Sequence, residues 1–295
     1  MAHAQVITVI PHWNLKKDLA ECLDSLQRIA YPAHQVVVVD NASTDGSVEF
    51  LREQYPWVHM IGLPQNGGFA VALNAGIAFA LNAGAAYVFA LNNDTVVRPD
   101  VLARLVALMD AEPSIGVVAP KVLYYDHPEL IYRLGDRMYR WLPLPIGFGT
   151  KWRDHPRYTG VMEFDYVSGC AMLIRATLFH EIGLFDPTYF MYYEDADFCR
   201  RVRAHRYRIV CLGDAVLYHK TSLSAKKDPA LICRIRARNR VRFYRRFPHG
   251  PHPWLTYLAL TLIAIWRLVA DVIRGRRDLL KPYLLGLRDG WREVV

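Results

Sequence analysis

Two short acidic clusters in this 295-residue chain have residue types and spacings that could perform chemistry. The first, Asn92-Asn93-Asp94, follows an apolar run that predicts a strand, and its carboxylate and amide oxygens are hard ligands suited to Mg²⁺ or Mn²⁺. The second, Glu194-Asp195-Ala196-Asp197, lies in a stretch otherwise rich in Phe, Met and Tyr. Carboxylates crowded among aromatic side chains desolvate and repel one another, which raises at least one pKa. Such a carboxylate is a candidate general base.

Helical geometry predicts different roles for the carboxylates of the second cluster, because they would point in different directions. If a helix begins there, Asp195 and Asp197 point about 200° apart, because successive residues turn by about 100°. Asp197 then lies one turn before Arg200 and Arg201, which favours a structural salt bridge. Asp195 is therefore the favoured general base, and Glu194 is the second candidate.

Two further polar residues end strand-like runs. Asp40 follows Val36–Val39, where its carboxylate could contact a nucleotide or form a turn, and position alone does not decide between them. His219 could ligate a metal, although a lone histidine is more often structural.

Asp94 is the one carboxylate of the Asn92-Asn93-Asp94 cluster and would hold a metal weakly by itself. A substrate diphosphate would therefore have to supply much of the coordination. Asp45 precedes Gly46 in a turn that suits a helix N-cap, a structural role.

The elements that must position these residues alternate over the first 120 residues. Short apolar runs predict strands, and segments with apolar residues at helical spacing predict helices. Strands are expected at 6–10, 36–39, 58–63, 86–91 and 115–119, and helices at 48–55, 69–81 and 101–109. This alternation indicates an α/β fold whose mostly parallel central sheet is flanked by helices and binds ligands at the carboxyl ends of its strands.

The pattern changes after residue 120. Residues 121–160 are rich in Tyr, Trp, Pro and Gly, and their lack of periodicity predicts an irregular segment. Further strands are expected at 164–167, 171–174, 208–212 and 215–218, and helices at 194–204, 228–246, 254–275 and 279–292. The predicted organisation is a catalytic domain over 1–224, with halves at 1–120 and 121–224, followed by a basic, amphipathic helical C-terminal extension over 225–295.

The net charge of +8 is concentrated at the C-terminal end. Residues 226–295 contain 16 Lys and Arg against 5 Asp and Glu, whereas the rest of the chain contains 20 against 23. Residues 254–266 carry no charge but would span only about 20 Å as a helix, less than the ~30 Å hydrocarbon core. An interfacial helix on an anionic membrane surface is therefore favoured over a membrane span. The alternatives are a solvated basic face and a helix packed on the catalytic domain or on a second subunit.

The cysteines and the N-terminus bear on the compartment. The five cysteines contain no Cys-x-x-Cys pair, which argues against a zinc site or a disulfide framework and suits a reducing compartment. The first residues lack the pattern of a signal peptide. We expect a cytoplasmic protein peripherally associated with the inner face of the plasma membrane. No nucleic-acid-binding motif accompanies the arginines, and no G-x-G-x-x-G follows the first strand, so neither nucleic-acid binding nor dinucleotide-dependent oxidation is expected.

In their order and spacing, the motifs resemble glycosyltransferase family 2, which has the GT-A fold, and particularly its rhamnosyltransferase-like bacterial members. The resemblance extends from Val6 to about Ser224. It rests on the runs Val39–Ser47, Asn66–Ala70, Asn74–Ile77, Leu91–Thr95, Ser168–Ile174, Gly183–Asp186, Glu194–Asp197 and His219. Two departures stand out: Asn92-Asn93-Asp94 replaces the family's Asp-x-Asp, and the Tyr often found before Asn14 is missing.

The resemblance implies a role for each candidate residue. The nucleoside-diphosphate sugar, dTDP- or UDP-linked, would be bound by Asp40, Asn41, Asn66, Gly67 and Asn93. The metal, Mg²⁺ or Mn²⁺, would be held by Asp94 and His219. Asp195 matches the carboxylate that deprotonates the acceptor hydroxyl, with Glu194 as the fallback.

The implied activity is metal-dependent, inverting sugar transfer of the hexosyltransferase type. The first candidate is transfer of rhamnose from dTDP-rhamnose to a hydroxyl of a glycan or lipid-linked saccharide acceptor in cell-surface polysaccharide synthesis. The alternative is a catalytically inert sugar-nucleotide-binding or scaffold protein of the same fold. The resemblance does not decide whether the protein forms a homo-oligomer.

Overall fold

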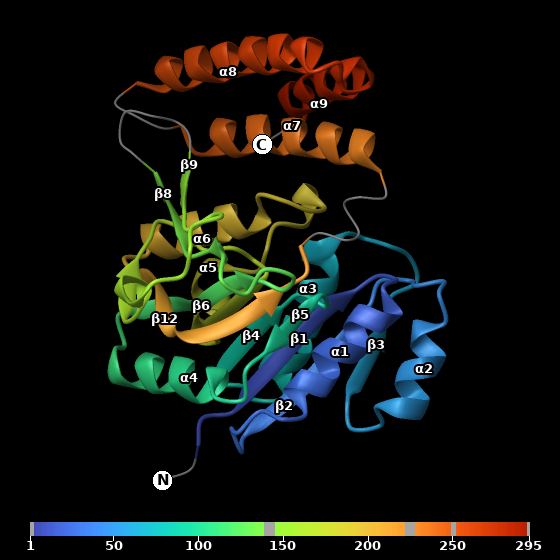
Figure 1. The fold of residues 1–295 in the computed structure, drawn as a ribbon, viewed down its shortest axis with the longest axis vertical. Helices are drawn as coiled ribbons and strands as arrows, with labels where there is room; N and C mark the ends of the chain where they lie inside the picture. Colours follow the sequence, from blue (N-terminus) through green and yellow to red (C-terminus); the bar gives the residue numbers. More distant parts are fainter. Residues whose placement is uncertain (1–2, 139–144, 222–227, 249–251, 294–295) are drawn as a thin grey trace. The chain divides into compact units, whose positions relative to one another are not determined.

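The computed structural model describes residues 3–138, 145–221, 228–248 and 252–293, and the chain divides into two compact units (Figure 1). The first unit comprises Met1–Asp136, Gly147–Phe190 and Glu194–Leu223. The second comprises Arg137–Ile146, Met191–Tyr193 and Ser224–Val295.

The first unit is built on a sheet whose N-terminal half is parallel. Its strands here are β1 (Val6–His12), β2 (His34–Asp40), β3 (His59–Gly62) and β4 (Tyr87–Leu91), arranged in the order β4-β1-β2-β3. The connecting helices are α1 (Lys16–Leu26), α2 (Ser47–Gln54) and α3 (Phe69–Asn82). Continuous Val and Ile runs form the central strands because a parallel sheet is covered by helices on both faces.

The other half of the sheet is mixed. It contains β5 (Thr95–Val97), β6 (Ile115–Tyr124), β7 (Ile131–Arg133), β10 (Val161–Glu163), β11 (Ala171–Arg175) and β12 (Arg208–His219). β11 lies antiparallel between β4 and β6, whereas β12 runs parallel to β6. The predicted class, α/β with a central sheet flanked by helices, is confirmed; the parallel pairing expected for most of the sheet dominates only its N-terminal half.

Two hydrophobic layers cover the sheet of the first unit. One contains the buried faces of α1, α2 and α4 (Val101–Ala111). The other contains those of α3, α5 (Thr177–Ile182) and α6 (Glu194–Ala204). Val36 and Val38 point into the first layer while Val37 and Val39 point into the second, as the two-residue period of a strand requires. The carboxyl ends of β1, β2 and β4 are thereby fixed at one edge.

The predictions for 121–175 are partly wrong. Part of the segment expected to be irregular is ordered, because β6 extends to Tyr124 and is followed by β7, β8 (Gly135–Met138) and β9 (Pro145–Phe148). Residues 139–144 of that segment lie outside the described part of the chain. The strand expected at 164–167 is absent from the described residues; Phe164 and Tyr166 make separate backbone contacts to Ile209 and Asp136. Without a continuous partner strand, no ladder forms.

The two strands expected at 208–212 and 215–218 are one strand, β12. Its pairing with β6 shifts register between Leu212 and Val216, so a bulge absorbs the polar residues that interrupt the apolar pattern. The bulge lets the strand continue to His219, which is a candidate site residue.

The second unit contains three helices close to the predicted ranges: α7 (Pro229–Arg246), α8 (Pro253–Ile273) and α9 (Leu280–Arg292). Asp228 accepts a hydrogen bond from the backbone N–H of Leu231 at 2.9 Å and caps α7. Gly286 and Gly290 let α9 approach α7 closely. A Cβ on Gly286 would lie 2.3 Å from the carbonyl oxygen of Arg234, which is too near for any other residue.

A buried asparagine of α7 holds a strained segment of the second unit. The side-chain nitrogen of Asn239 donates to the carbonyls of Met191 at 2.9 Å and Tyr192 at 2.8 Å. Tyr192 and Tyr193 have φ angles of 66° and 76°, in the left-handed region that costs free energy for residues other than glycine. Asn239 therefore stabilises a conformation that local preference disfavours.

Asn239→Ala is expected to lower the free energy of unfolding by about 1–3 kcal/mol, because two part-buried carbonyls lose their donor. Urea denaturation followed by circular dichroism measures the change. Leu231→Ala, at an exposed position of the same helix, is the control and should change the stability by less than about 0.5 kcal/mol. Equal effects of the two substitutions would show that Asn239 does not stabilise the segment.

Candidate active site

Asp195 lies in the first turn of α6 and is held by two backbone N–H groups. Its Oδ2 accepts from Gly169 at 2.9 Å and its Oδ1 from Ala196 at 2.8 Å. Burial raises the pKa of Asp195 above its ordinary value of 3.8, although both N–H groups and the charge of Arg133 oppose the shift. The carboxylate is nevertheless only half-buried. It is thus oriented, accessible and poised to accept a proton, as a general base must be.

The two neighbouring carboxylates have other environments. Glu194 is buried, and its Oε2 has no hydrogen-bond partner among the described residues. Burial, together with the charge of Asp195, raises the pKa of Glu194 well above 4.5, which favours its protonated form. Asp197 is fully buried and accepts from Arg201 Nε at 2.8 Å and from the Tyr189 hydroxyl at 3.2 Å. The salt bridge predicted for Asp197 is confirmed, with Arg201 as the partner.

The structure brings together Asp94 and His219, 125 residues apart in the chain. Asp94 lies in the turn between β4 and β5, and His219 ends β12, which pairs with β5. Asp94 Oδ1 and His219 Nε2 are 3.0 Å apart, and both side chains are buried. Burial acts to raise the pKa of Asp94, but the hydrogen bond and charge of His219 outweigh it, so the pKa lies below 3.8. The ring of Tyr132 packs edge-on against His219 at 4.8 Å.

This pair fits a divalent cation that takes its remaining ligands from a substrate. One carboxylate and one imidazole are a donor set that Mn²⁺ accepts, and Nδ1 of His219 has no partner within the described residues. Across 3–138, 145–221, 228–248 and 252–293, no cluster of three or more His, Cys, Asp or Glu side chains forms a complete metal site. The protein would therefore supply two ligands and depend on the diphosphate for the others.

Two consecutive residues connect the two acidic clusters. The N–H of Gly169 holds Asp195, and the carbonyl of Cys170 accepts from the N–H of Asn92 at 2.9 Å. These residues precede β11, which pairs directly with β4. Insertion of β11 beside β4 therefore places Asp195 and the Asn92–Asp94 turn at the same edge of the sheet.

The residues expected at the nucleotide form a second hydrogen-bonded group. Asn41 Oδ1 accepts from Gly67 N at 2.9 Å, and its Nδ2 donates to the carbonyl of Gly68 at 3.0 Å. Asn66 Oδ1 accepts from Gly68 N at 3.0 Å. Gly68 has a φ of 89°, and a Cβ there would lie 2.5 Å from the carbonyl oxygen of Phe190, so glycine is required. The turn after β3 is thus fastened to the end of β2.

Asp40 lies beside His12, a histidine that was not predicted to belong to the site. His12 pairs in register with Asp40 at the ends of β1 and β2, and its Nδ1 lies 2.8 Å from the amide nitrogen of Asn93. Burial lowers the pKa of His12 to about 4, despite the opposing charges of Asp40 and Asp45, so the ring is neutral at pH 7. With Nδ1 accepting from Asn93, the proton lies on Nε2. Its strand-end position was the signal that could have identified it.

His12 and Asp40 leave a complementary donor and acceptor. His12 Nε2 and Asp40 Oδ1 are buried and have no partner among the described residues. The other oxygen of Asp40 accepts from Ser43 N at 3.1 Å. Unpartnered buried polar atoms cost free energy, which a ligand that pairs with them would recover.

Asp45 has a structural role, although the N-cap position of α2 predicted for it belongs to Gly46. Its Oδ1 accepts from Ser47 N at 3.2 Å at the start of α2, and its Oδ2 accepts from Lys16 N at 3.0 Å at the start of α1. Asn14 supports the same loop by accepting from Thr44 N at 2.9 Å. These bonds fix the loop after β2 without using Asp40.

An ion pair near Asp195 was also missed. Arg133 Nη1 donates to Asp136 Oδ1 at 3.1 Å, across the junction of β7 and β8. Burial raises the pKa of Asp136 to about 6; Arg133 opposes the shift and the charge of Asp195 adds to it. The two residues lie in the segment expected to be irregular, so sequence periodicity gave no sign of them.

Arg133→Gln is expected to move the acid limb of the transfer rate to higher pH. The base must be ionised, so kcat/KM falls as pH drops through its raised pKa. The charge of Arg133 favours ionised Asp195, so removing that charge raises the pKa of Asp195 further. The pH dependence of kcat/KM measures the shift, with the exposed Arg52→Gln as control. An unchanged or lower apparent pKa would contradict this coupling.

Comparison with known sequences identifies one family and individual relatives that this chain resembles. The family model described as "Glycosyl transferase family 2" matches residues 7–183. An N-acetylglucosaminyl-diphospho-decaprenol L-rhamnosyltransferase of Mycobacterium tuberculosis is 28% identical over 243 residues, covering 76% of this chain and 77% of the relative.

Solved structures give the same fold. The mannosyltransferase PcManGT from Pyrobaculum calidifontis, in complex with GDP-Man and Mn²⁺, has a TM-score of 0.61 at 18% identity. The match covers 99% of this chain and 88% of the mannosyltransferase chain. GalNAc-T7 with UDP, GalNAc and Mn²⁺ has a TM-score of 0.62 at 17% identity. The match covers 82% of this chain and 48% of the GalNAc-T7 chain. Since both identities are below 25%, these likenesses concern the fold alone.

Proposed function

The chain belongs to glycosyl transferase family 2, and from this premise we propose that it moves a sugar from a nucleoside-diphosphate donor to an acceptor hydroxyl with inversion. The first candidate donor is dTDP-rhamnose, and the rhamnosyltransferase relative supports rhamnose as the transferred sugar. The same relative supports a lipid-linked saccharide as acceptor. The observation that carries the proposal is the link through Gly169 and Cys170 between Asp195 and the Asn92–Asp94 turn.

The nucleotide would be recognised at the ends of β1 and β2. His12 Nε2 and Asp40 Oδ1 offer one donor and one acceptor without protein partners in the described chain. Thymine and uracil present the complementary pair, a carbonyl beside an N–H. Cytosine presents the opposite arrangement at the same edge, an unprotonated ring nitrogen beside an amino group. This pairing supports a dTDP- or UDP-linked donor, with Asn41, Asn66, Gly67 and Asn93 shaping the surrounding turns.

Asp94 and His219 would hold Mg²⁺ or Mn²⁺ together with diphosphate oxygens. When bound, the cation supplies positive charge that neutralises the leaving nucleoside diphosphate. Asp94 directly precedes β5, and His219 ends β12, which pairs with β5, so both side chains would be fixed before the donor arrives.

Asp195 would remove the proton from the acceptor hydroxyl. The acceptor oxygen forms a bond to the anomeric carbon while the bond from that carbon to the diphosphate oxygen breaks. The electron pair leaves with the nucleoside diphosphate, and the proton remains on Asp195. Attack from the face opposite the leaving group inverts the anomeric configuration. The N–H groups of Gly169 and Ala196 orient the carboxylate for this transfer.

We also propose that the second unit associates with the anionic inner face of the plasma membrane. α8 is long and apolar enough to cross a membrane by length and composition alone. Its charged residues Arg267 and Asp271 pair at 2.6 Å, and Asp271 also pairs with Arg276 at 3.0 Å. Because these charges lie on one side of the helix while its exposed side is apolar, an interfacial orientation satisfies both sides.

Thermal-shift measurements with a panel of nucleoside diphosphates and their sugars test the proposal. Thymidine or uridine diphosphate sugars with Mn²⁺ or Mg²⁺ should raise the melting temperature more than cytidine diphosphate does. The best donor should then release nucleoside diphosphate when an acceptor is added, and EDTA should suppress the release. Donor binding with no release in either condition would instead support the inert sugar-nucleotide-binding protein.

A further inference from the structure

The polarity of α8 is inverted relative to that of a helix on the surface of a soluble domain. Between Trp254 and Ile273, exposed large apolar side chains recur every three or four residues along one face. On the opposite side, the polar residues Thr256 and Asp271 are buried together with Leu260. Surface helices of soluble domains bury their apolar face and expose their polar one. The exposed face of α8 therefore requires an apolar environment.

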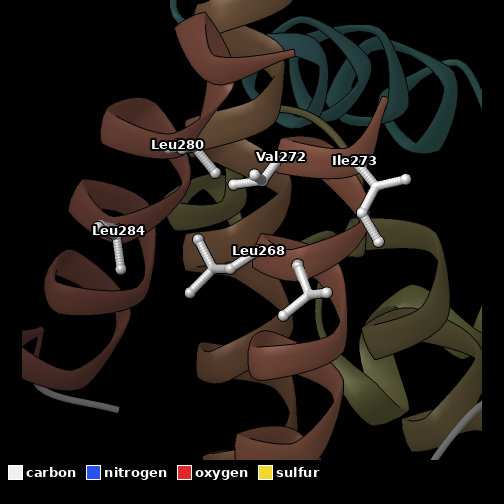
Figure 2. Close-up of a pocket in the computed structure, with 6 residues that line it drawn as sticks. Leu268, Val272, Ile273, Leu280 and Leu284 are labelled. Atoms are coloured by element: carbon white, nitrogen blue, oxygen red, sulfur yellow. The ribbon is translucent and has the colours of Figure 1, made fainter. Parts of the chain in front are cut away.

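A pocket lies at the C-terminal end of this face. Its volume is about 310 Å³, and it is lined by Leu268, Val269, Val272, Ile273, Leu280 and Leu284. Figure 2 shows Leu268 on α8 and Leu284 on α9 projecting from the two helices that form its walls. Val269, Val272 and Ile273 belong both to the pocket and to the exposed face, so the pocket is continuous with that face.

The chemistry of the lining selects an apolar occupant. All six side chains are aliphatic, so the lining offers a polar occupant no hydrogen-bond partner, and covering it removes apolar surface from water. A volume of 310 Å³ holds roughly ten methylene-sized groups, if each takes about the 30 Å³ of a liquid water molecule. One segment of a lipid chain is of this size.

A basic turn joins the two walls of the pocket. Between Ile273 and Leu280, the chain carries Arg274, Arg276 and Arg277 against one carboxylate, Asp278, and Lys281 follows immediately. Arg274, Arg277 and Lys281 are exposed, while Arg276 pairs with Asp271. Cations within a few residues of an apolar pocket complement a molecule that joins a phosphate to a hydrocarbon chain.

We propose that the α8–α9 pocket binds one acyl chain of an anionic membrane phospholipid, with the phosphate at the turn formed by residues 274–281. The inference rests on the membrane association proposed above and deepens it, because it replaces a general surface with a binding site for a single lipid. Because the pocket is continuous with the apolar face of α8, a membrane bound to that face would bring its lipids to the opening of the pocket.

Titration of the full-length protein with dioctanoylphosphatidylglycerol, kept below its critical micelle concentration, tests the site. Calorimetry should show saturable binding of one lipid per chain. Inorganic phosphate alone should not bind, and dioctanoylphosphatidylcholine should bind at least fivefold more weakly. Equal binding of the two lipids would overturn the role of the basic turn. Tighter binding of farnesyl phosphate than of either lipid would overturn the choice of a phospholipid.

Matched substitutions separate the pocket from the surface. Val272→Phe fills the pocket and should weaken dioctanoylphosphatidylglycerol binding at least tenfold. Leu262→Phe, on the same exposed face but outside the pocket, should change it less than twofold. Both variants should sediment with phosphatidylglycerol vesicles like the wild type, since both keep the face apolar. Equal lipid affinities of the two variants would overturn the proposal.

Two further measurements keep the result interpretable. If Val272→Phe alters the circular dichroism spectrum, Leu284→Glu replaces it, with Leu258→Glu as the matched control outside the pocket. Sedimentation velocity tests the competing occupant, and a dimer that Val272→Phe dissociates would overturn lipid binding. The donor-induced thermal shift, measured on the same samples, reports the proposed function separately.

Discussion

Asp195→Asn will lower kcat for sugar transfer by about 10²–10⁴-fold while leaving the donor dissociation constant within about twofold of the wild type. Asparagine keeps the size of the side chain and can still accept hydrogen bonds from Gly169 or Ala196 through its oxygen. It cannot take a proton from the acceptor. The loss therefore falls on the chemical step and not on donor binding.

Glu194→Gln is the matched control for this result. Glu194 is buried, and burial favours its protonated form, to which glutamine is close in shape and charge. We expect its kcat to stay within about fivefold of the wild type, since no proton transfer depends on it. Transfer rates with saturating donor and acceptor compare the variants, and calorimetry gives donor affinity. Near wild-type turnover of Asp195→Asn, or a larger loss in Glu194→Gln, would remove Asp195 as the base.

Asp94→Asn will lower kcat/KM by about 10²–10³-fold and abolish the response of donor binding to Mn²⁺. The described chain offers one carboxylate and one imidazole at this position, so losing the carboxylate leaves no anionic protein ligand. Removing the metal with EDTA should reproduce the defect in the wild type. The two losses should not add, because both remove the same interaction.

Donor-induced thermal shifts, with and without Mn²⁺, give a readout that does not depend on turnover. In the wild type, Mn²⁺ should increase the shift produced by the nucleoside-diphosphate sugar. In Asp94→Asn the two conditions should coincide, while the exposed Asp126→Asn should behave like the wild type. A wild-type shift that is insensitive to Mn²⁺ and EDTA would contradict a metal held by Asp94 and His219.

Residue periodicity predicted those parts of the fold that depend on local pattern. The buried strand Val36–Val39 is part of β2, and the helices expected at 228–246 and 254–275 correspond to α7 and α8. In each case the spacing of apolar residues within the segment matches one buried strand or one helix face. The secondary structure could therefore be predicted from residues that are close in the sequence.

Pairing between distant strands could not be predicted in this way. β11 is an apolar run like many others, and nothing near it in sequence says that it inserts antiparallel between β4 and β6. The ordered strands after Tyr124 were missed for the same reason, since the aromatic and glycine residues there pack against distant partners. Long-range pairing is selected by the whole sheet and not by any local pattern.

The candidate site shows the same division. Helical geometry correctly assigned Asp197 to a structural salt bridge, because Arg201 lies one turn away on the same helix. The resemblance to a family suggested a joint role for Asp94 and His219, but their contact depends on the pairing of β5 with β12, which was not predicted. The strand-end position of His12 could have marked it as a candidate, but its contacts with Asn93 and its place beside Asp40 depend on the register of β1 and β2. The roles assigned to Asp195 and the nucleotide-binding residues stay predictions.

The most direct test of the central claim is the anomeric configuration of the transferred sugar. Proton NMR of the product, formed with the donor selected by thermal shift, Mn²⁺ and a lipid-linked saccharide acceptor, compares that configuration with the donor's. Single displacement by an acceptor activated at Asp195 predicts one glycoside per nucleoside diphosphate released, with the configuration inverted. A product that retains the donor's configuration, or release of nucleoside diphosphate without any glycoside, would contradict the account.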